Sequence, residues 1–262
     1  MLRDILVYLW QAGAWFGRYP RTASWTWVPD FFRWQKARRH GLSSLDFEQP
    51  WMCLPAVRAL GRLVDAQTRA FEYGCGGSTL FLAQRCRQVI SVEHDPYWSE
   101  EIRQRVKKRG LCNSVIELVL PQNIDGRDEL DTVYGYGSSD LRFAGHSFRA
   151  YVHAIEAYPR QYFDLILVDG RARPACIRLA CQWLAPGGAL VLDNAEDPTY
   201  AAVQRERPLT KWRRLRCAGP VYGTVAFSAT QFWFRPLNAA DISPRCTWHM
   251  MAPRRAAGLR GN

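Results

Sequence analysis

Residues 71–95 read FEYGCGGSTLFLAQRCRQVISVEHD, and this stretch decides the expected fold. A short apolar run, predicted to be a strand, leads into Gly74, Gly76 and Gly77 and then into a helix-like run. A glycine-rich turn lets the backbone approach a ligand closely, and the start of the following helix offers unpaired N–H groups. Glu93 ends the next strand-like run, where a carboxylate can accept hydrogen bonds from ribose hydroxyls. The pattern indicates a nucleotide-like ligand, either a dinucleotide or S-adenosylmethionine.

Around this stretch, predicted strands alternate with predicted helices, which is typical of a parallel sheet covered on both faces. The expected strands are 69–73, 88–95, 114–120, 162–170 and 187–194, followed by a hairpin-like pair at 211–219 and 225–236. The expected helices are 55–66, 76–86, 96–110, 147–158 and 174–185. The fold class is therefore α/β, a Rossmann-like, mostly parallel sheet of seven strands with a final antiparallel strand.

Three segments are expected along the chain. Residues 1–50 form a basic, Trp-rich helical extension or cap, in which 2–16 is a predicted helix. Residues 51–240 form the α/β domain, and residues 241–262 form a basic tail. The long polar, Gly-rich segment 121–147 is expected to be a functional loop, because structureless loops of that length are uncommon in compact domains.

The glycine motif separates the two candidate ligands. Dinucleotide sites use GxGxxG, whose third glycine permits close strand–helix packing, whereas this chain has Thr79 at that position. An acidic residue, Glu72, precedes Gly74 by two positions. This acidic-x-Gly-x-Gly pattern resembles the first motif of the class I S-adenosylmethionine-dependent methyltransferases. EHD at 93–95, FDLILVDG at 163–170 and LAPGGALVLDN at 184–194 resemble later motifs of that family, in the same order.

The resemblance extends over roughly residues 54–235, and VEHDPYW, VDGRAR and LDNAEDPTY are similar to a little-characterised bacterial branch of small methyltransferases. It implies S-adenosylmethionine as the cofactor, with Glu93 on the ribose and His94 and Asp95 near the adenine. The complete cofactor set that it implies is Glu72, Tyr73, Gly74, Cys75, Gly76, Gly77, Ser78, Thr79, Glu93, His94, Asp95, Asp169 and Gly170.

Polar residues at predicted strand ends are the candidates for chemistry. Asp169 follows a parallel strand at the end where ligands bind, and is the leading catalytic residue. Together with Asp193 and Asn194 it resembles the ligand set of metal-dependent O-methyltransferases, which suits Mg²⁺; the alternative is helix capping or cofactor binding. His146, in the long loop, is a second candidate base. Arg171, Arg173 and Tyr136 are the expected substrate contacts, the arginines through a carboxylate or phosphate.

Charge is concentrated at the two ends of the chain. The net charge of +11 comes from 35 basic and 24 acidic residues, of which seven and two lie in residues 1–41, and eleven and two in residues 205–262. An anionic partner at the periphery is one interpretation, and a merely basic surface is the other. Trp and Arg in the extension suit a membrane interface, although a packed cap is the favoured interpretation. No apolar run is long enough to span a membrane, and the cysteines show no metal or paired spacing, so we expect a cytoplasmic protein, with a peripheral place at the inner membrane surface as the variant.

Three functions remain open. The first is an S-adenosylmethionine-dependent methyltransferase that methylates an oxygen of a small molecule or glycan presented in solution or at a membrane. The second is a methyltransferase of RNA or another nucleic acid, which the basic ends favour. The third is a non-catalytic scaffold that keeps the cofactor-binding fold. The sequence leaves the acceptor and the oligomeric state open.

Overall fold

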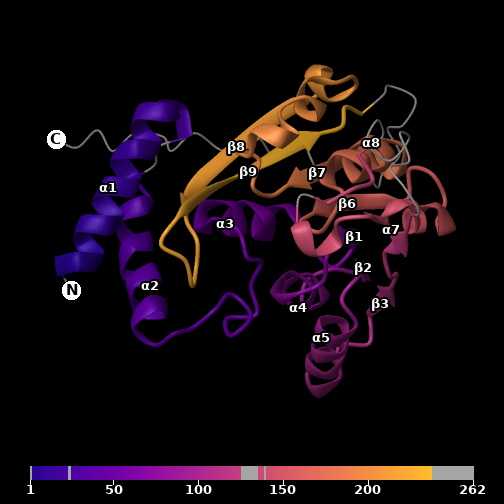
Figure 1. The fold of residues 1–262 in the computed structure, drawn as a ribbon, viewed down its shortest axis with the longest axis horizontal. Helices are drawn as coiled ribbons and strands as arrows, with labels where there is room; N and C mark the ends of the chain where they lie inside the picture. Colours follow the sequence, from indigo (N-terminus) through magenta and orange to yellow (C-terminus); the bar gives the residue numbers. More distant parts are fainter. Residues whose placement is uncertain (1, 23–24, 125–134, 139, 238–262) are drawn as a thin grey trace, which may run out of the picture.

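The computed structural model describes residues 2–22, 25–124, 135–138 and 140–237. A sheet of seven strands in the order β3-β2-β1-β6-β7-β9-β8 forms the centre of the molecule (Figure 1). Its strands are β1 Arg69–Tyr73, β2 Gln88–Glu93, β3 Ser114–Leu118, β6 Phe163–Val168, β7 Leu184–Leu192, β8 Arg213–Pro220 and β9 Phe227–Phe234.

Strands β3, β2, β1, β6 and β7 pair in parallel, whereas β9 is antiparallel to both β7 and β8. The last strand therefore inserts between β7 and the edge strand β8. This arrangement confirms the predicted α/β class, the seven strands and the reversed final strand. Because the carboxyl ends of the parallel strands share one edge, residues that follow β1, β2, β6 and β7 come together there.

Helices cover both faces of the sheet because alternate strand residues point to opposite sides. Phe71, Ile166 and Leu190 pack with residues of α7 Arg149–His153 and α8 Arg173–Trp183. Their neighbours in sequence, including Ala70 and Leu165, pack on the other side with α3 Leu54–Leu63 and α4 Gly77–Ala83. Helix α5 Pro96–Lys108 packs on α4 and β3. The core is thus two layers of side chains around one sheet.

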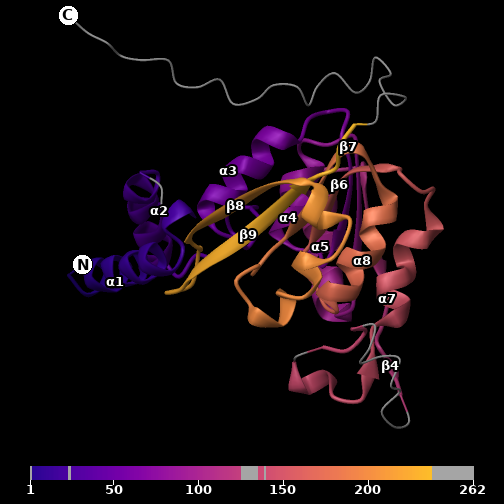
Figure 2. The ribbon, with the colours of Figure 1, turned by 90° about the horizontal axis from the view of Figure 1, so that it is seen from above.

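The N-terminal extension is helical, as predicted. Helices α1 Leu2–Arg18 and α2 Trp27–Arg39 lie side by side next to the β8–β9 end of the sheet (Figures 1 and 2). The indole N–H groups of Trp27 and Trp34 donate to the carbonyls of Ala218 and Thr224 at 2.8 and 2.7 Å. These two indoles are packed on the strand pair and are buried, in agreement with the cap interpretation for this part of the extension.

The described structure differs from the sequence prediction mainly at element ends. Helix α4 ends at Ala83 rather than Cys86, and the predicted helix 147–158 breaks after His153 into a 3-10 turn, Ala154–Ala157. The long loop contains a small antiparallel pair, β4 Gln122–Asn123 with β5 His146–Ser147. The predicted tail 241–262 lies outside the described residues, so the domain limits stay predictions. None of the helices in the described ranges is long and apolar enough to cross a bilayer.

Candidate active site

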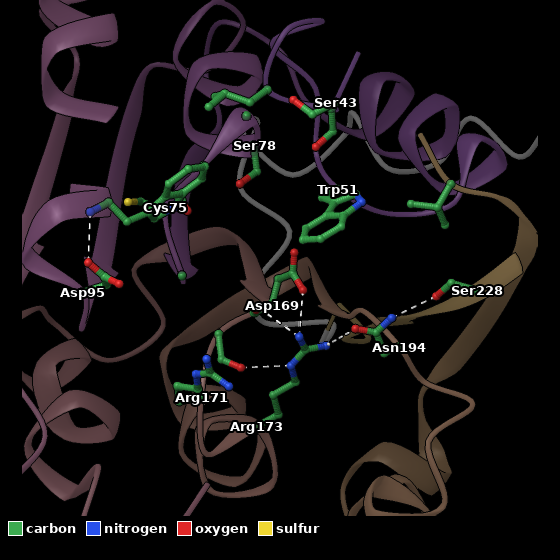
Figure 3. Close-up of a pocket in the computed structure, with 18 of the residues that line it drawn as sticks. Ser43, Trp51, Cys75, Ser78, Asp95, Asp169, Arg171, Arg173, Asn194 and Ser228 are labelled. Atoms are coloured by element: carbon green, nitrogen blue, oxygen red, sulfur yellow. Dashed lines mark hydrogen bonds and ion pairs between the residues drawn. The ribbon is translucent and has the colours of Figure 1, made fainter. Parts of the chain in front are cut away.

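A cavity of about 850 Å³ opens at the carboxyl edge of the parallel strands, a size typical of small-molecule sites. Ten of the thirteen predicted cofactor residues line it: Gly74, Cys75, Gly76, Gly77, Ser78, Glu93, His94, Asp95, Asp169 and Gly170. Arg171, Arg173 and Asn194 also line it, as Figure 3 shows for several of these side chains. The topology therefore gathers most of the predicted site in one hollow.

Each glycine of the turn has a different structural role. Gly74 has φ +95°, and a Cβ there would come within 3.0 Å of the Gly170 backbone, so the ends of β1 and β6 approach closely only without side chains. A Cβ on Gly77 would lie 2.2 Å from the Gln49 carbonyl oxygen. A Cβ on Gly76 would meet nothing nearer than the Trp98 ring at 3.8 Å. Gly77 thus serves packing of the segment after α2, whereas Gly76 leaves open space beside the cavity.

Glu72 holds the turn from behind. Its Oε1 accepts hydrogen bonds from the hydroxyls of Ser91, at 2.5 Å, and Thr79, which in turn accepts the Gly76 N–H at 3.0 Å. Burial raises the pKa of Glu72 to about 7 against these hydrogen bonds, and within the described residues its Oε2 has no partner. Contrary to the resemblance, Glu72, Thr79 and Tyr73 do not belong to the cavity lining, because all three are fully buried one layer below it.

Glu93 ends β2 with its carboxylate on the cavity wall. Its Oε1 accepts the backbone N–H groups of His94 and Asp95 at 2.7 and 2.9 Å, and its Oε2 accepts that of Cys75 at 3.0 Å. Burial works to raise the pKa of Glu93, but the His94 ring and these N–H groups outweigh it and hold the pKa below its usual range. Glu93 is therefore an ionised acceptor fixed at the mouth of the glycine turn.

The side chains of His94 and Asp95 make different kinds of contact. The His94 Nδ1 lies 2.6 Å from Glu93 Oε1, and its Nε2 accepts a hydrogen bond from Arg171 Nε at 3.3 Å. The Asp95 carboxylate caps α5 by accepting the N–H groups of Tyr97 and Trp98 at 2.9 and 3.0 Å. Asp95 therefore lines the cavity chiefly as a helix cap.

Asp169 and Arg173 form the floor of the cavity (Figure 3). Arg173 Nη2 lies 3.0 Å from Asp169 Oδ1, and its Nη1 donates to Asn194 Oδ1 at 3.0 Å. The guanidinium also donates to the carbonyls of Asp169, Gly170 and Asp193. Burial raises the pKa of Asp169 and Arg173 opposes the rise. Arg173 is consequently a fixed cation that ties the ends of β6 and β7 together.

The predicted metal ligands do not fit a metal site. Arg173, a cation, already stands between Asp169 and Asn194. The Asp193 carboxylate instead lies 2.6 Å from the Thr230 hydroxyl on β9, is 1% exposed, and is absent from the cavity lining. Across the described ranges, no group of three or more His, Cys, Asp or Glu could hold a metal ion. In place of a metal ion, Asp169 and Asn194 bind Arg173, and Asp193 binds Thr230.

Two other predicted residues are also placed away from the cavity lining. The His146 Nδ1 lies 3.2 Å from the Ala144 carbonyl oxygen, and β5 carries the residue in the small β4–β5 pair. The Tyr136 hydroxyl lies 2.9 Å from His153 Nε2 on α7. His146 as a base and Tyr136 as a substrate contact are thus not supported by the geometry.

Arg171 does reach the site. Its Nη2 lies 3.1 Å from Asp140 Oδ2 and its guanidinium lies over the Phe143 ring at 5.2 Å. Arg142 binds the same Asp140 carboxylate at 2.6 Å. Asp140 therefore holds two arginines at the rim, which neutralises part of the positive charge expected to face a substrate.

A second part of the cavity lining was missed by the sequence prediction. It consists of Ser43, Ser44, Leu45 and Trp51 from the segment after α2, of Val221, Thr224 and Ala226 between β8 and β9, and of Phe227 and Ser228 at the start of β9. These two segments are joined by the Trp51 indole N–H, which donates to the Tyr222 carbonyl at 3.1 Å. The two segments are about 170 positions apart in the sequence, so no local sequence pattern could predict that they meet. The only local signal in the first segment is the Pro-Trp pair at 50–51.

No protein-family model and no curated protein sequence matches this chain. Several solved structures are similar to it at low identity. The O-methyltransferase TomG from Streptomyces achromogenes, in complex with SAM, is 16% identical over 77% of this chain and 90% of that chain, with a TM-score of 0.47. An rRNA methylase from Streptococcus thermophilus is 17% identical over 70% of this chain and 97% of that chain, with a TM-score of 0.45. The N-methyltransferase NodS from Bradyrhizobium japonicum, in complex with S-adenosyl-L-homocysteine, is 17% identical over 78% and 98%, with a TM-score of 0.41.

Proposed function

We propose that this chain, whose fold is that of the class I S-adenosylmethionine-dependent methyltransferases, transfers a methyl group from S-adenosylmethionine to a hydroxyl of a small molecule or glycan. The observation that carries the proposal is the cavity, which has the glycine turn and Glu93 on one wall and Trp51 and Ser228 on the other. Such a hollow suits two ligands placed end to end. The bound cofactor would supply an electrophilic methyl group on its sulfonium.

The glycine wall suits the cofactor. Glu93 is ionised and oriented by three backbone N–H groups, so it can accept a ribose hydroxyl without further ordering. The space beside Gly76 would be lost with any larger residue pointing toward Trp98. Glu72 supports this wall indirectly, because its carboxylate holds the Thr79 hydroxyl that accepts the Gly76 N–H.

The wall that includes Trp51 and Ser228 suits a ring-bearing acceptor. Trp51 is 61% exposed, and its N–H is already fixed to Tyr222, so the indole face is available to a sugar or aromatic ring. Ser228 and Asn194, bonded to each other at 3.1 Å, add hydroxyl and amide groups beside it. In Figure 3, Trp51 and Asp169 border the same open space.

Asp169 is the proposed catalytic residue. Its carboxylate, held by Arg173, can accept a hydrogen bond from the acceptor hydroxyl and so align the oxygen for in-line attack. Burial raises the pKa of Asp169, which improves it as a proton acceptor relative to an exposed carboxylate. The Arg173 guanidinium, 3.0 Å away, opposes that rise.

The test is methyl transfer from labelled S-adenosylmethionine to a panel of phenols and sugars. We expect turnover with at least one ring-bearing hydroxyl acceptor, and a loss of about 100-fold in kcat for Asp169→Asn with cofactor affinity unchanged. Trp51→Ala should raise KM for the acceptor without changing cofactor affinity. The surface variant Glu101→Gln is the control. Full turnover by Asp169→Asn would refute its catalytic role, and methylation of RNA alone would refute the acceptor class.

A further inference from the structure

Helices α1 and α2, with Trp25 between them, carry a set of apolar side chains that the rest of the described chain leaves uncovered. On α1, Leu2, Leu6 and Leu9 recur three or four residues apart, which places them on one side of the helix. The complete set, here named the apolar face, is Leu2, Leu6, Leu9, Trp10, Phe16, Trp25, Val28 and Phe32, each exposed between 58% and 92%. Isolated apolar residues on a surface are ordinary, but a contiguous patch marks an interaction site.

Five of the eight residues of the apolar face, Leu9, Phe16, Trp25, Val28 and Phe32, line a groove between the two helices. The groove has a volume of about 770 Å³. The floor of the groove, which includes Tyr8, rests on the domain: Tyr8 and Trp34 are buried with Phe227 of the sheet edge. The helix pair therefore has one side seated on the domain and the other turned outward, at the end of the molecule beside β8 and β9 (Figure 1).

The charges of the helix pair point to an anionic partner. Both of its acids are used internally, Asp4 with Arg38 at 3.6 Å and Asp30 with Arg58 at 2.5 Å. Six exposed cations of the extension have no ion-pair partner among the described residues: Arg3, Arg18, Arg21, Arg33, Lys36 and Arg39. Of these, Arg33 and Lys36 line a separate hollow beside Leu54 and Tyr222. A surface that combines outward apolar side chains, including two exposed indoles, with surplus cations matches the interface of an anionic bilayer.

We propose that the α1–α2 pair docks this protein on the surface of an anionic membrane, with the apolar face at headgroup depth. A second copy of the chain fits less well, because pairing two such faces would bring the same surplus cations together. Nucleic acid also fits less well, since phosphate binding uses cations but gains nothing from eight exposed apolar side chains.

Docking would bring the proposed acceptor site close to the lipid, with the helix pair between them. Phe227 lines the cavity and also contacts Tyr8 and Trp27, with ring centroids 5.1 and 5.3 Å apart. One side chain thus separates the docked helices from the acceptor wall. This consequence rests on the proposed methyl transfer, and the acceptor class that it favours is a ring-bearing headgroup on a lipid anchor.

The experiment is vesicle flotation of the full chain. Vesicles of phosphatidylcholine alone are compared with vesicles that also contain phosphatidylglycerol, at low and high salt. We expect at least about tenfold more bound protein on the anionic vesicles at low salt, since each cation near such a surface adds favourable energy that salt screens. The double variant Leu6→Glu with Phe32→Glu should lose about tenfold of that binding.

Matched controls separate docking from general effects of charge. Val115→Glu with Leu141→Glu makes the same change at exposed sites elsewhere and should leave binding unchanged. Arg3→Glu with Arg21→Glu should weaken binding, whereas Lys107→Glu with Lys108→Glu on α5 should not. Thermal melting of each variant checks that it folds.

Three results would overturn the proposal: no binding to anionic vesicles at low salt, equal binding by the Leu6→Glu, Phe32→Glu variant, or a dimer in sedimentation that this variant abolishes. Tight binding of RNA that competes with vesicles and ignores the apolar variants would also count against it. Flotation needs no turnover, so its failure would leave the methyltransferase proposal standing.

Discussion

The guanidinium of Arg173 lies 3.0 Å from the Asp169 carboxylate, at the place where the sequence suggested a metal ion. The same guanidinium binds the Asn194 amide oxygen, so two of three expected metal ligands hold an arginine instead. We therefore expect neither EDTA nor added Mg²⁺ to change cofactor affinity or turnover by more than about twofold, since a bound cation in this position would have to displace the guanidinium. Titration calorimetry and a rate assay check this. A rise in rate of tenfold or more with Mg²⁺ would show that the arginine gives way.

Arg173→Ala should destabilise the protein by about 3–5 kcal/mol, because it leaves the largely buried Asp169 carboxylate without its partner. The stability of Arg173→Lys should lie between those of the natural protein and Arg173→Ala. Lysine keeps the charge, but its ammonium cannot reproduce the forked guanidinium that binds both strand ends. Urea unfolding measures the differences. Arg178, on the same helix as Arg173, forms a more exposed ion pair with Glu206. Arg178→Ala should therefore lower the unfolding free energy by at most about 1 kcal/mol. Equal losses for the two alanine variants would contradict a special role for Arg173.

Glu72 should make stability depend on pH. Its pKa in the folded protein is raised from 4.5 to about 7 by burial, so the folded state binds its proton more tightly than the unfolded state does. The resulting stabilisation is present in full below the unfolded pKa and is lost as pH rises through the folded one. Relative to Glu72→Gln, the natural protein should lose about 3 kcal/mol of unfolding free energy from about pH 5 to about pH 8. Urea titrations of both proteins across this range test the slope.

Two adjacent glycines should respond differently to alanine. Gly77→Ala places a methyl group against the Gln49 backbone and should cost about 1–3 kcal/mol, because backbone on both sides must move. The methyl group of Gly76→Ala would meet nothing nearer than 3.8 Å, so the unfolding free energy should change by no more than about 0.5 kcal/mol. The same methyl group should weaken cofactor binding, because it enters the space proposed for the cofactor. Thermal melting and cofactor titration of both variants give the comparison. A stable Gly77→Ala would mean that the segment carrying Gln49 adapts easily.

The sequence predicted the strands well because their apolar runs and glycine boundaries are local. Strand β1 was expected at 69–73 and is observed there. The glycine turn and Glu93 line one cavity, and their binding of the cofactor stays a prediction. The prediction of Asp193 as a metal ligand failed because it considered only the strand end that carries the residue. Asp193 follows β7, but the antiparallel pairing of β7 with β9 places Thr230 beside it, and that partner takes its carboxylate.

The part of the cavity formed by Trp51 and the β8–β9 turn could not be predicted, because its two segments are far apart in the sequence. Trp51 joins the β8–β9 turn through Tyr222, and no periodicity in either segment signals that contact. His146 lies in the long loop, as expected, but the sequence did not predict that it forms a short strand paired with Gln122–Asn123. The Trp-rich extension was partly foreseen: Trp27 and Trp34 pack as a cap, whereas Trp10 and Trp25 are 70% and 92% exposed.

Calorimetric titration of the purified protein with S-adenosylmethionine tests the central claim most directly, with NAD as the competing ligand. We expect micromolar binding of S-adenosylmethionine, loss of about tenfold or more in Glu93→Ala, since a carboxylate acceptor to the ribose disappears, and unchanged affinity in the surface variant Glu100→Ala. Binding of NAD in place of S-adenosylmethionine, or unchanged affinity in Glu93→Ala, would contradict the account.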